Sequence, residues 1–99
     1  MIYHVVSEVQ WQQAIQQGFY AADSLASEGF IHLSKKEQVQ GVLNRYYKNA
    51  PNLLLLHIDE AKLQAEIKYE LAASVNEYFP HLYGPLNLDA VITTTAISH

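Results

Sequence analysis

The chain has 99 residues, of which 49% are hydrophobic and 16% charged, and ten acidic against six basic side chains give a net charge of −4. This length supports one hydrophobic core, and the balance of apolar and charged residues excludes a disordered chain. The absence of cysteine excludes disulfides, thiolate metal sites and cysteine nucleophiles. The negative charge does not indicate nucleic acid as a partner. We expect one domain over residues 1–99.

The apolar segments of the sequence are short. The longest, Leu53 to Leu56 with Ile58 beyond it, falls far below the roughly 20 residues that a membrane helix requires. The amino terminus lacks the basic stretch and apolar core of a secretory signal. We therefore expect a cytoplasmic protein without a membrane partner. The sequence leaves its oligomeric state open.

The first elements are a short strand and a helix. Residues 2–6 are β-branched and aromatic, and they predict a strand on which His4 shares a face with apolar neighbours. Ser7 and Gln10 have the spacing of a capping box. The apolar positions that follow predict a helix from about residue 8 to residue 17.

A loop and a second strand follow. Turn-forming residues predict a loop over 18–29 with at most one helical turn. Residues 30–34 alternate in the manner of a strand. The alternation places an aliphatic pair toward the core and sets His32 and Ser34 on the opposite face.

The middle of the chain combines an amphipathic helix with an aliphatic strand. Ser34 and Glu37 have the spacing of a second capping box, which predicts a helix that ends near Lys48. The aliphatic run within residues 52–59 predicts a central strand, because such runs occur where both faces of a sheet are covered. The aspartate at the end of this run is expected to cap a helical turn over residues 60–63.

The last third of the chain predicts two further strands. Residues 66–71 alternate as in a half-buried strand, with Glu70 on its polar face or at a pocket rim. Two prolines and a glycine within 75–87 argue against a long regular element there. Residues 89–97 predict a final strand. Because the connections are too short for helical crossovers, we expect an α+β fold with small mixed or antiparallel sheets and two main helices.

Five histidines are the most function-like feature of the sequence, because an ordinary histidine pKa of about 6.5 permits proton transfer near neutral pH. His99 is the last residue, and His57 ends the most apolar strand, so we interpret them as tail and structure. His4, His32 and His81 remain. Three imidazoles suit a metal, but the close spacing that marks such sites is absent and we predict none.

Other polar residues have both structural and functional interpretations. Ser34 is better explained as a helix cap than as a nucleophile, although a helix start beside two lysines also suits phosphate. The rigid segment over 79–86, which carries His81 and Tyr83, is equally a stiff turn or a wall of a ligand site. Glu70 is the candidate general base or oxocarbenium stabiliser, with a solvated strand glutamate as the alternative.

Several blocks of the sequence resemble a known family when they are taken in order: IYH, SLASEGFIHLSKKEQV, NRYY, LLLLHID, KYE and FPHLYGPLNLDAV. They resemble domain-of-unknown-function family 952, small bacterial proteins with this layout over nearly the whole chain. That family is similar to a compact ADP-ribosyltransferase fold, in which two small sheets form a cleft that binds NAD. The resemblance implies that His4 holds a ribose and that the strand of His32 and Ser34 lines the nicotinamide side. It also implies that Glu70, or the segment of His81 and Tyr83, supports the transition state.

Two hypotheses about function follow. In the first, NAD or a related phosphorylated nucleotide binds in a histidine-lined cleft, where ADP-ribosyl or phosphoryl-type transfer takes place. In the second, the same fold is a noncatalytic module that binds a small metabolite or a protein. The predicted site consists of Glu70 and His81 as catalytic residues and His4, His32, Ser34 and Tyr83 as ligand-binding residues.

Overall fold

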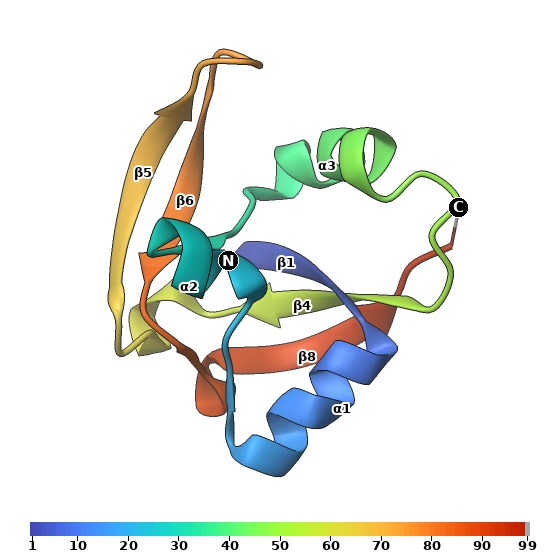
Figure 1. The fold of residues 1–99 in the computed structure, drawn as a ribbon, viewed down its shortest axis with the longest axis vertical. Helices are drawn as coiled ribbons and strands as arrows, with labels where there is room; N and C mark the ends of the chain where they lie inside the picture. The colour runs from blue at the N-terminus through green and yellow to red at the C-terminus, as the bar shows by residue number, and fades with distance from the viewer. Residues whose placement is uncertain (99) are drawn as a thin grey trace.

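The fold is an α+β arrangement of three antiparallel sheets and three α-helices in a computed structural model that describes residues 1–98 (Figure 1). His99, interpreted above as a tail, lies outside the described residues. The α+β class and the small antiparallel sheets confirm the prediction from the sequence. Within residues 1–98, no helix combines the length and the apolar character needed to cross a membrane.

The first sheet contains β1 (Ile2–Ser7), β4 (Leu53–Ile58) and β8 (Val91–Ala96) in the order β1-β4-β8. The aliphatic β4 is the central strand, as its sequence predicted, because both of its edges are paired and its side chains pack on apolar neighbours. The last strand begins at Val91 rather than at residue 89, because a 3₁₀ turn over Leu88–Ala90 precedes it.

The second sheet consists of β3 (Ile31–His32), β6 (Glu77–Tyr83) and β5 (Glu66–Ala72). Strands β5 and β6 form a hairpin that projects from the rest of the chain in Figure 1. The predicted half-buried strand over 66–71 is confirmed by β5.

The prediction that no long regular element occupies residues 75–87 was wrong, because β6 runs for seven residues through Pro80. The amide nitrogen and carbonyl of one strand residue face the same neighbouring strand. The Pro80 carbonyl accepts a hydrogen bond from the Leu33 amide at 3.0 Å. The position where Pro80 lacks an N–H therefore faces β3 and not β5. Because β3 ends at His32, no β3 residue opposite Pro80 loses a partner, and the pairing of β6 with β5 is intact.

The predicted first helix is α1 (Glu8–Gln17). Its capping box is formed as the sequence indicated, with the Ser7 hydroxyl accepting from the Gln10 amide at 3.1 Å. The helix ends at Gly18, whose φ of 92° is a left-handed conformation that glycine adopts without strain.

The loop predicted over 18–29 contains more structure than expected. It holds α2 (Asp23–Glu28), a helix of six residues, and the two-residue strand β2 (Phe19–Tyr20). Strand β2 pairs with β7 (Leu86–Asn87) in a separate sheet. Elements of two residues show no periodicity in sequence, so tertiary pairing alone reveals them.

The predicted cap at Ser34 was wrong. A 3₁₀ turn over Lys36–Gln38 leads into α3 (Val39–Tyr46), and the Lys35 amide donates to the Gln38 side chain at 2.9 Å. Ser34 lies too early for this role, because its backbone pairs with β1 instead. The predicted cap at Asp59 is confirmed, since its carboxylate accepts from the Ala61 amide at 3.0 Å at the start of the 3₁₀ turn Glu60–Lys62.

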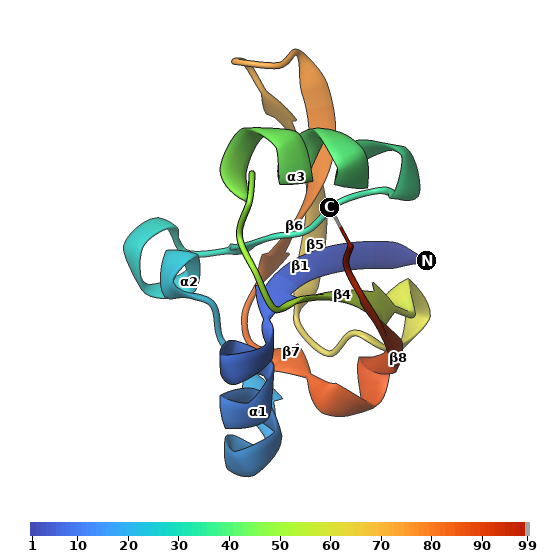
Figure 2. The same cartoon turned by 90° about the vertical axis from the view of Figure 1, so that its right-hand side faces the viewer.

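Residues 31–34 form a junction between the two larger sheets. The Leu33 amide bonds to β6, whereas the amide and carbonyl of Ser34 exchange two 2.8 Å hydrogen bonds with Tyr3 of β1. Figure 2 shows this segment passing above β1 on its way from α2 to α3. The side chains of Ile31 and Leu33 are buried in the core, as their alternation predicted.

His4 ties this junction to β2. Its Nδ1 lies 2.8 Å from the His32 carbonyl oxygen and its Nε2 lies 2.9 Å from the Tyr20 hydroxyl. Because a carbonyl only accepts, Nδ1 carries the proton and Nε2 accepts from Tyr20. Burial lowers the pKa of His4 to about 4, so the ring is neutral at physiological pH.

This burial predicts that stability depends on pH through His4. The folded pKa of about 4 lies below the ordinary value of 6.5, so the unfolded chain binds more protons between these values. The contribution of His4 is complete above about pH 6.5 and decreases as the pH falls. We expect the free energy of unfolding to lose about 3 kcal/mol from this source between pH 7 and pH 4.

Urea denaturation of the parent chain and of His4→Gln at both pH values measures this contribution. The variant is less stable at pH 7, because glutamine does not reproduce both hydrogen bonds. It should nevertheless lose less stability on acidification, because the titrating group is gone. Equal losses in the two proteins would contradict the assignment.

Candidate functional site

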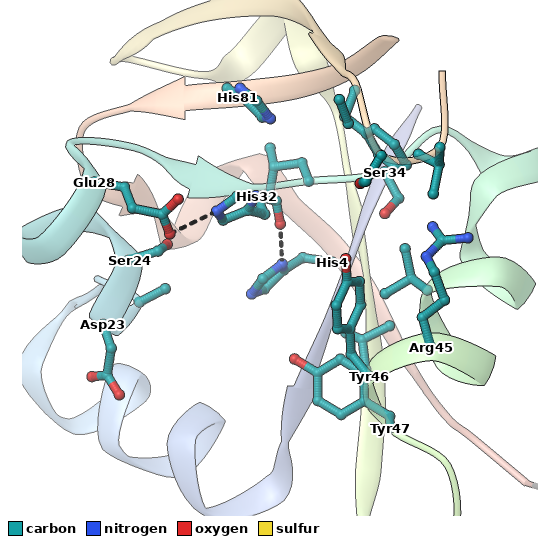
Figure 3. A pocket seen from close by; sticks show the side chains of 18 of the residues that line it. His4, Asp23, Ser24, Glu28, His32, Ser34, Arg45, Tyr46, Tyr47 and His81 are labelled. Atoms are coloured by element: carbon teal, nitrogen blue, oxygen red, sulfur yellow. Dashed lines mark hydrogen bonds and ion pairs between the residues drawn. The ribbon is translucent and has the colours of Figure 1, made fainter. Parts of the chain in front are cut away.

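A pocket of about 700 Å³ opens between α2 and α3 (Figure 3). Strand β1 contributes His4 to it, the junction contributes His32 and Ser34, and β6 contributes His81. Helix α2 lies on one side with Asp23, Ser24 and Glu28, and α3 lies on the other with Arg45 and Tyr46. The volume suits a ligand of mononucleotide or dinucleotide size.

The structure brings four of the six predicted site residues to this pocket. They are His4, His32, Ser34 and His81. Glu70 and Tyr83 are absent from the lining; Glu70 is hydrogen-bonded to His81, and the Tyr83 hydroxyl donates to Glu70. The His4 ring borders the pocket with both nitrogens already hydrogen-bonded, so its role is to hold the wall in place.

His81 and Glu70 form a carboxylate–histidine pair across strands β5 and β6. Nδ1 of His81 lies 2.9 Å from Glu70 Oε1, and the Tyr83 hydroxyl donates to the same oxygen. The hydrogen bond from Tyr83, followed by the one from His81, holds the pKa of Glu70 below its usual value. The same hydrogen bond raises the pKa of Tyr83. Glu70 is therefore an ionised acceptor that fixes a proton on Nδ1 of His81.

The second ring nitrogen of His81 is open. No buried side-chain nitrogen or oxygen of residues 1–98 lacks a hydrogen-bond partner. Nε2 of His81 has no partner within these residues, so solvent reaches this atom although the residue as a whole is only 8% exposed. Phe30 stacks on the ring with centroids 4.1 Å apart and planes inclined by 17°, which fixes its orientation. His81 thus presents one free nitrogen from a rigid frame.

His32 forms a second carboxylate–histidine pair. Its Nε2 lies 3.0 Å from Glu28 Oε2 at the end of α2 (Figure 3), and 51% of its side chain is exposed. His32 and His81 are direct cross-strand neighbours on β3 and β6, and their ring centroids lie 5.2 Å apart. Two imidazoles, each with its own carboxylate, therefore meet at one edge of the pocket.

Sequence reasoning missed several lining residues. The sequence did not identify Arg45, Asp23 or Glu28 as site residues, although all three line the pocket. Arg45 forms no ion pair within the described residues, where its guanidinium lies 5.7 Å from the Tyr46 ring. The NRYY block, in which Arg45 is followed by two tyrosines, was the available signal, because a guanidinium is attracted to an aromatic face.

The remaining described histidine lies elsewhere. Within the first sheet, Nε2 of His57 lies 3.0 Å from the Thr95 hydroxyl oxygen. The His57 and Tyr3 rings pack edge to face, with their centroids 5.1 Å apart. It borders a separate, smaller hollow beside Lys36. Across residues 1–98, no three histidine, cysteine, aspartate or glutamate side chains are arranged to hold a metal ion.

Comparison with solved structures places this fold beside one protein of Caulobacter crescentus. The crystal structure of CC0527 superimposes with a TM-score of 0.89 at 32% identity, covering 98% of this chain and 85% of that one. A crystal structure of a double mutant of the same protein matches with a TM-score of 0.89 at 31% identity and the same coverage. The solution NMR structure of CC0527 matches with a TM-score of 0.83 at 32% identity, covering 98% and 84%.

Comparison with sequence families agrees with this likeness. No curated protein matches the chain. Residues 5–94 match the profile of a family described as a protein of unknown function, DUF952. This match spans most of the 99 residues and includes the junction, both carboxylate–histidine pairs and Arg45. The chain belongs to the DUF952 family.

Proposed function

We propose that the chain binds a phosphorylated nucleotide in this pocket, with NAD as the first candidate. The observation that carries the proposal is that the two ends of the pocket carry groups of opposite charge. Carboxylates of α2 lie at one end, a cation of α3 that lacks an ion pair within residues 1–98 lies at the other, and histidine rings lie between them (Figure 3). A nucleotide has matching parts, because ribose hydroxyls donate to carboxylates and phosphates accept from a guanidinium.

The phosphate end of the ligand is assigned to Arg45. Of the four basic residues between positions 35 and 48, only Arg45 lines the pocket. A guanidinium remains charged at all physiological pH values and binds phosphate oxygens in a planar fork. The exposed Tyr46 beside it offers an aromatic face for a base or a nicotinamide ring.

The ribose end is assigned to the side of Glu28 and Asp23. The carboxylates of these two residues would accept hydrogen bonds from ribose hydroxyls, and the 5′-phosphate is the group that the Arg45 guanidinium would bind. The His32 ring lies on this side because of its bond to Glu28. The nucleotide is therefore oriented with its sugar beside the histidines and its 5′-phosphate toward α3.

Two features favour binding over ADP-ribosyl transfer. The resemblance to ADP-ribosyltransferases implies that His4 binds the ribose. Both nitrogens of His4, however, are already hydrogen-bonded to the His32 carbonyl and the Tyr20 hydroxyl. The resemblance also implies that Glu70 stabilises the transition state. This carboxylate, however, is hydrogen-bonded to His81 and Tyr83 and does not line the pocket. These contacts therefore support nucleotide binding and do not support ADP-ribosyl transfer.

Isothermal calorimetry with NAD, ADP-ribose and 2′-phosphorylated nucleotides tests the proposal. We expect saturable binding of at least one of them, and we expect Arg45→Gln to weaken it about tenfold, which corresponds to roughly 1.4 kcal/mol. Lys62→Gln is the matched control, because it removes the same charge from an exposed turn that does not line the pocket. No binding at millimolar ligand, or equal weakening by both substitutions, would refute the proposal.

A further inference from the structure

We propose that His81 and His32 act as a general base and a general acid that hydrolyse a cyclic phosphodiester on the ribose of the bound nucleotide. This inference rests on the proposed function, because Arg45 would hold the 5′-phosphate and so bring the sugar to the histidine side of the pocket. It adds a reaction to a site for which binding alone was argued. Its observation is that two imidazoles with separate carboxylate partners are cross-strand neighbours at one pocket edge.

His81 has the features of a general base. Glu70 holds the proton on Nδ1, so the solvent-reached Nε2 of the neutral ring carries the lone pair. The Glu70 carboxylate also stabilises the imidazolium that forms when Nε2 takes a proton. Phe30 stacking on one face and burial of the residue leave the ring little freedom to turn.

His32 has the features of a general acid. Its Nε2 is paired with Glu28, while its Nδ1 has no hydrogen-bond partner within residues 1–98. Protonated His32 therefore has an N–H to donate, and its exposed side chain regains a proton from solvent. With ring centroids 5.2 Å apart, the two imidazoles are close enough to reach different oxygens of one phosphate group.

A cyclic phosphodiester on the bound ribose is a substrate whose hydrolysis would use both groups. Water attacks phosphorus, a new P–O bond forms, and Nε2 of His81 takes the proton that the water loses. The bond between phosphorus and one ribose oxygen breaks, and that oxygen takes the proton of His32 Nδ1. The product is a phosphomonoester, and the two histidines return to their starting states by exchanging one proton each with solvent.

The leaving group explains why an acid is required. A ribose alkoxide is a poor leaving group unless it is protonated as the bond breaks, and a positioned acid or base contributes about 10² to 10⁴ in rate. Glu70 does not line the pocket, so it acts through His81 as a positioning residue. Glu70 can therefore support the reaction through His81 without contacting the ribose.

The experiment follows hydrolysis of adenosine 2′,3′-cyclic phosphate 5′-phosphate by ³¹P NMR, alongside the same compound without its 5′-phosphate. We expect turnover with a bell-shaped pH profile, because one histidine must be neutral and the other protonated. His81→Asn and His32→Asn should each lower kcat at least ~100-fold with KM changed less than about threefold. His57→Asn is the control and should keep full activity, since His57 lies outside the pocket.

The 5′-phosphate separates this inference from the proposed function. Arg45→Gln should raise KM only for the compound that carries the 5′-phosphate. Binding of this compound without hydrolysis, or a flat pH profile, overturns the acid–base pair and leaves nucleotide binding intact. If neither this compound nor NAD, ADP-ribose and the 2′-phosphorylated nucleotides bind, both proposals are overturned. Full activity in either histidine variant also overturns the pair.

The positioning role of Glu70 has its own test. Glu70→Gln should lower kcat about tenfold with KM changed less than about threefold, because a neutral amide stabilises the imidazolium formed in the transition state less than a carboxylate does. Glu66→Gln is the matched control on the same strand, since the Glu66 carboxylate has no hydrogen bond to His81 or Tyr83 among the described residues and lies 4.0 Å from the Lys68 ammonium. An unchanged kcat, or a rise in KM as large as the fall in kcat, would overturn this part of the inference.

Discussion

The pair of hydrogen bonds between Tyr3 and Ser34 is the constraint on which the site depends. The four-residue junction bonds to β6 through Leu33 and to β1 through Ser34, so it belongs to both larger sheets. Its aliphatic side chains enter the core, which forces the alternate side chains, His32 and Ser34, to the pocket. The pocket wall is thereby set by backbone pairing and burial rather than by polar contacts on the surface.

His4 stabilises this junction with both of its ring nitrogens, which leaves neither nitrogen free for a ligand. Its ring bonds to a junction carbonyl on one side and to Tyr20 on the other, which links β1, β3 and β2 through one buried side chain. Desolvation keeps the ring neutral, since a buried imidazolium would be costly. A histidine with both nitrogens engaged and a depressed pKa is a structural element, whereas His81 retains an open nitrogen.

The two carboxylate–histidine pairs differ in the way the fold holds them. Glu28 and His32 are four residues apart, and their pair joins the end of α2 to the strand that follows it. Glu70 and His81 come from the two strands of the β5–β6 hairpin, and the His81 ring is buried and stacked on Phe30. The Glu28–His32 pair is therefore open to solvent, whereas the Glu70–His81 pair holds its ring in one orientation.

The sequence by itself determined the α+β class, the central position of β4, the caps at Ser7 and Asp59 and the buried face of the junction. These features depend on local periodicity and capping, which are written in neighbouring residues. Only the tertiary structure decided that β6 passes through Pro80 and that Ser34 pairs with Tyr3 instead of capping a helix. It also decided that Glu70 is hydrogen-bonded to His81 and does not line the pocket. It also decided that Arg45 faces α2 across the pocket. Each of these features depends on contacts between residues distant in the chain, where pairing and burial override the preferences of the local sequence.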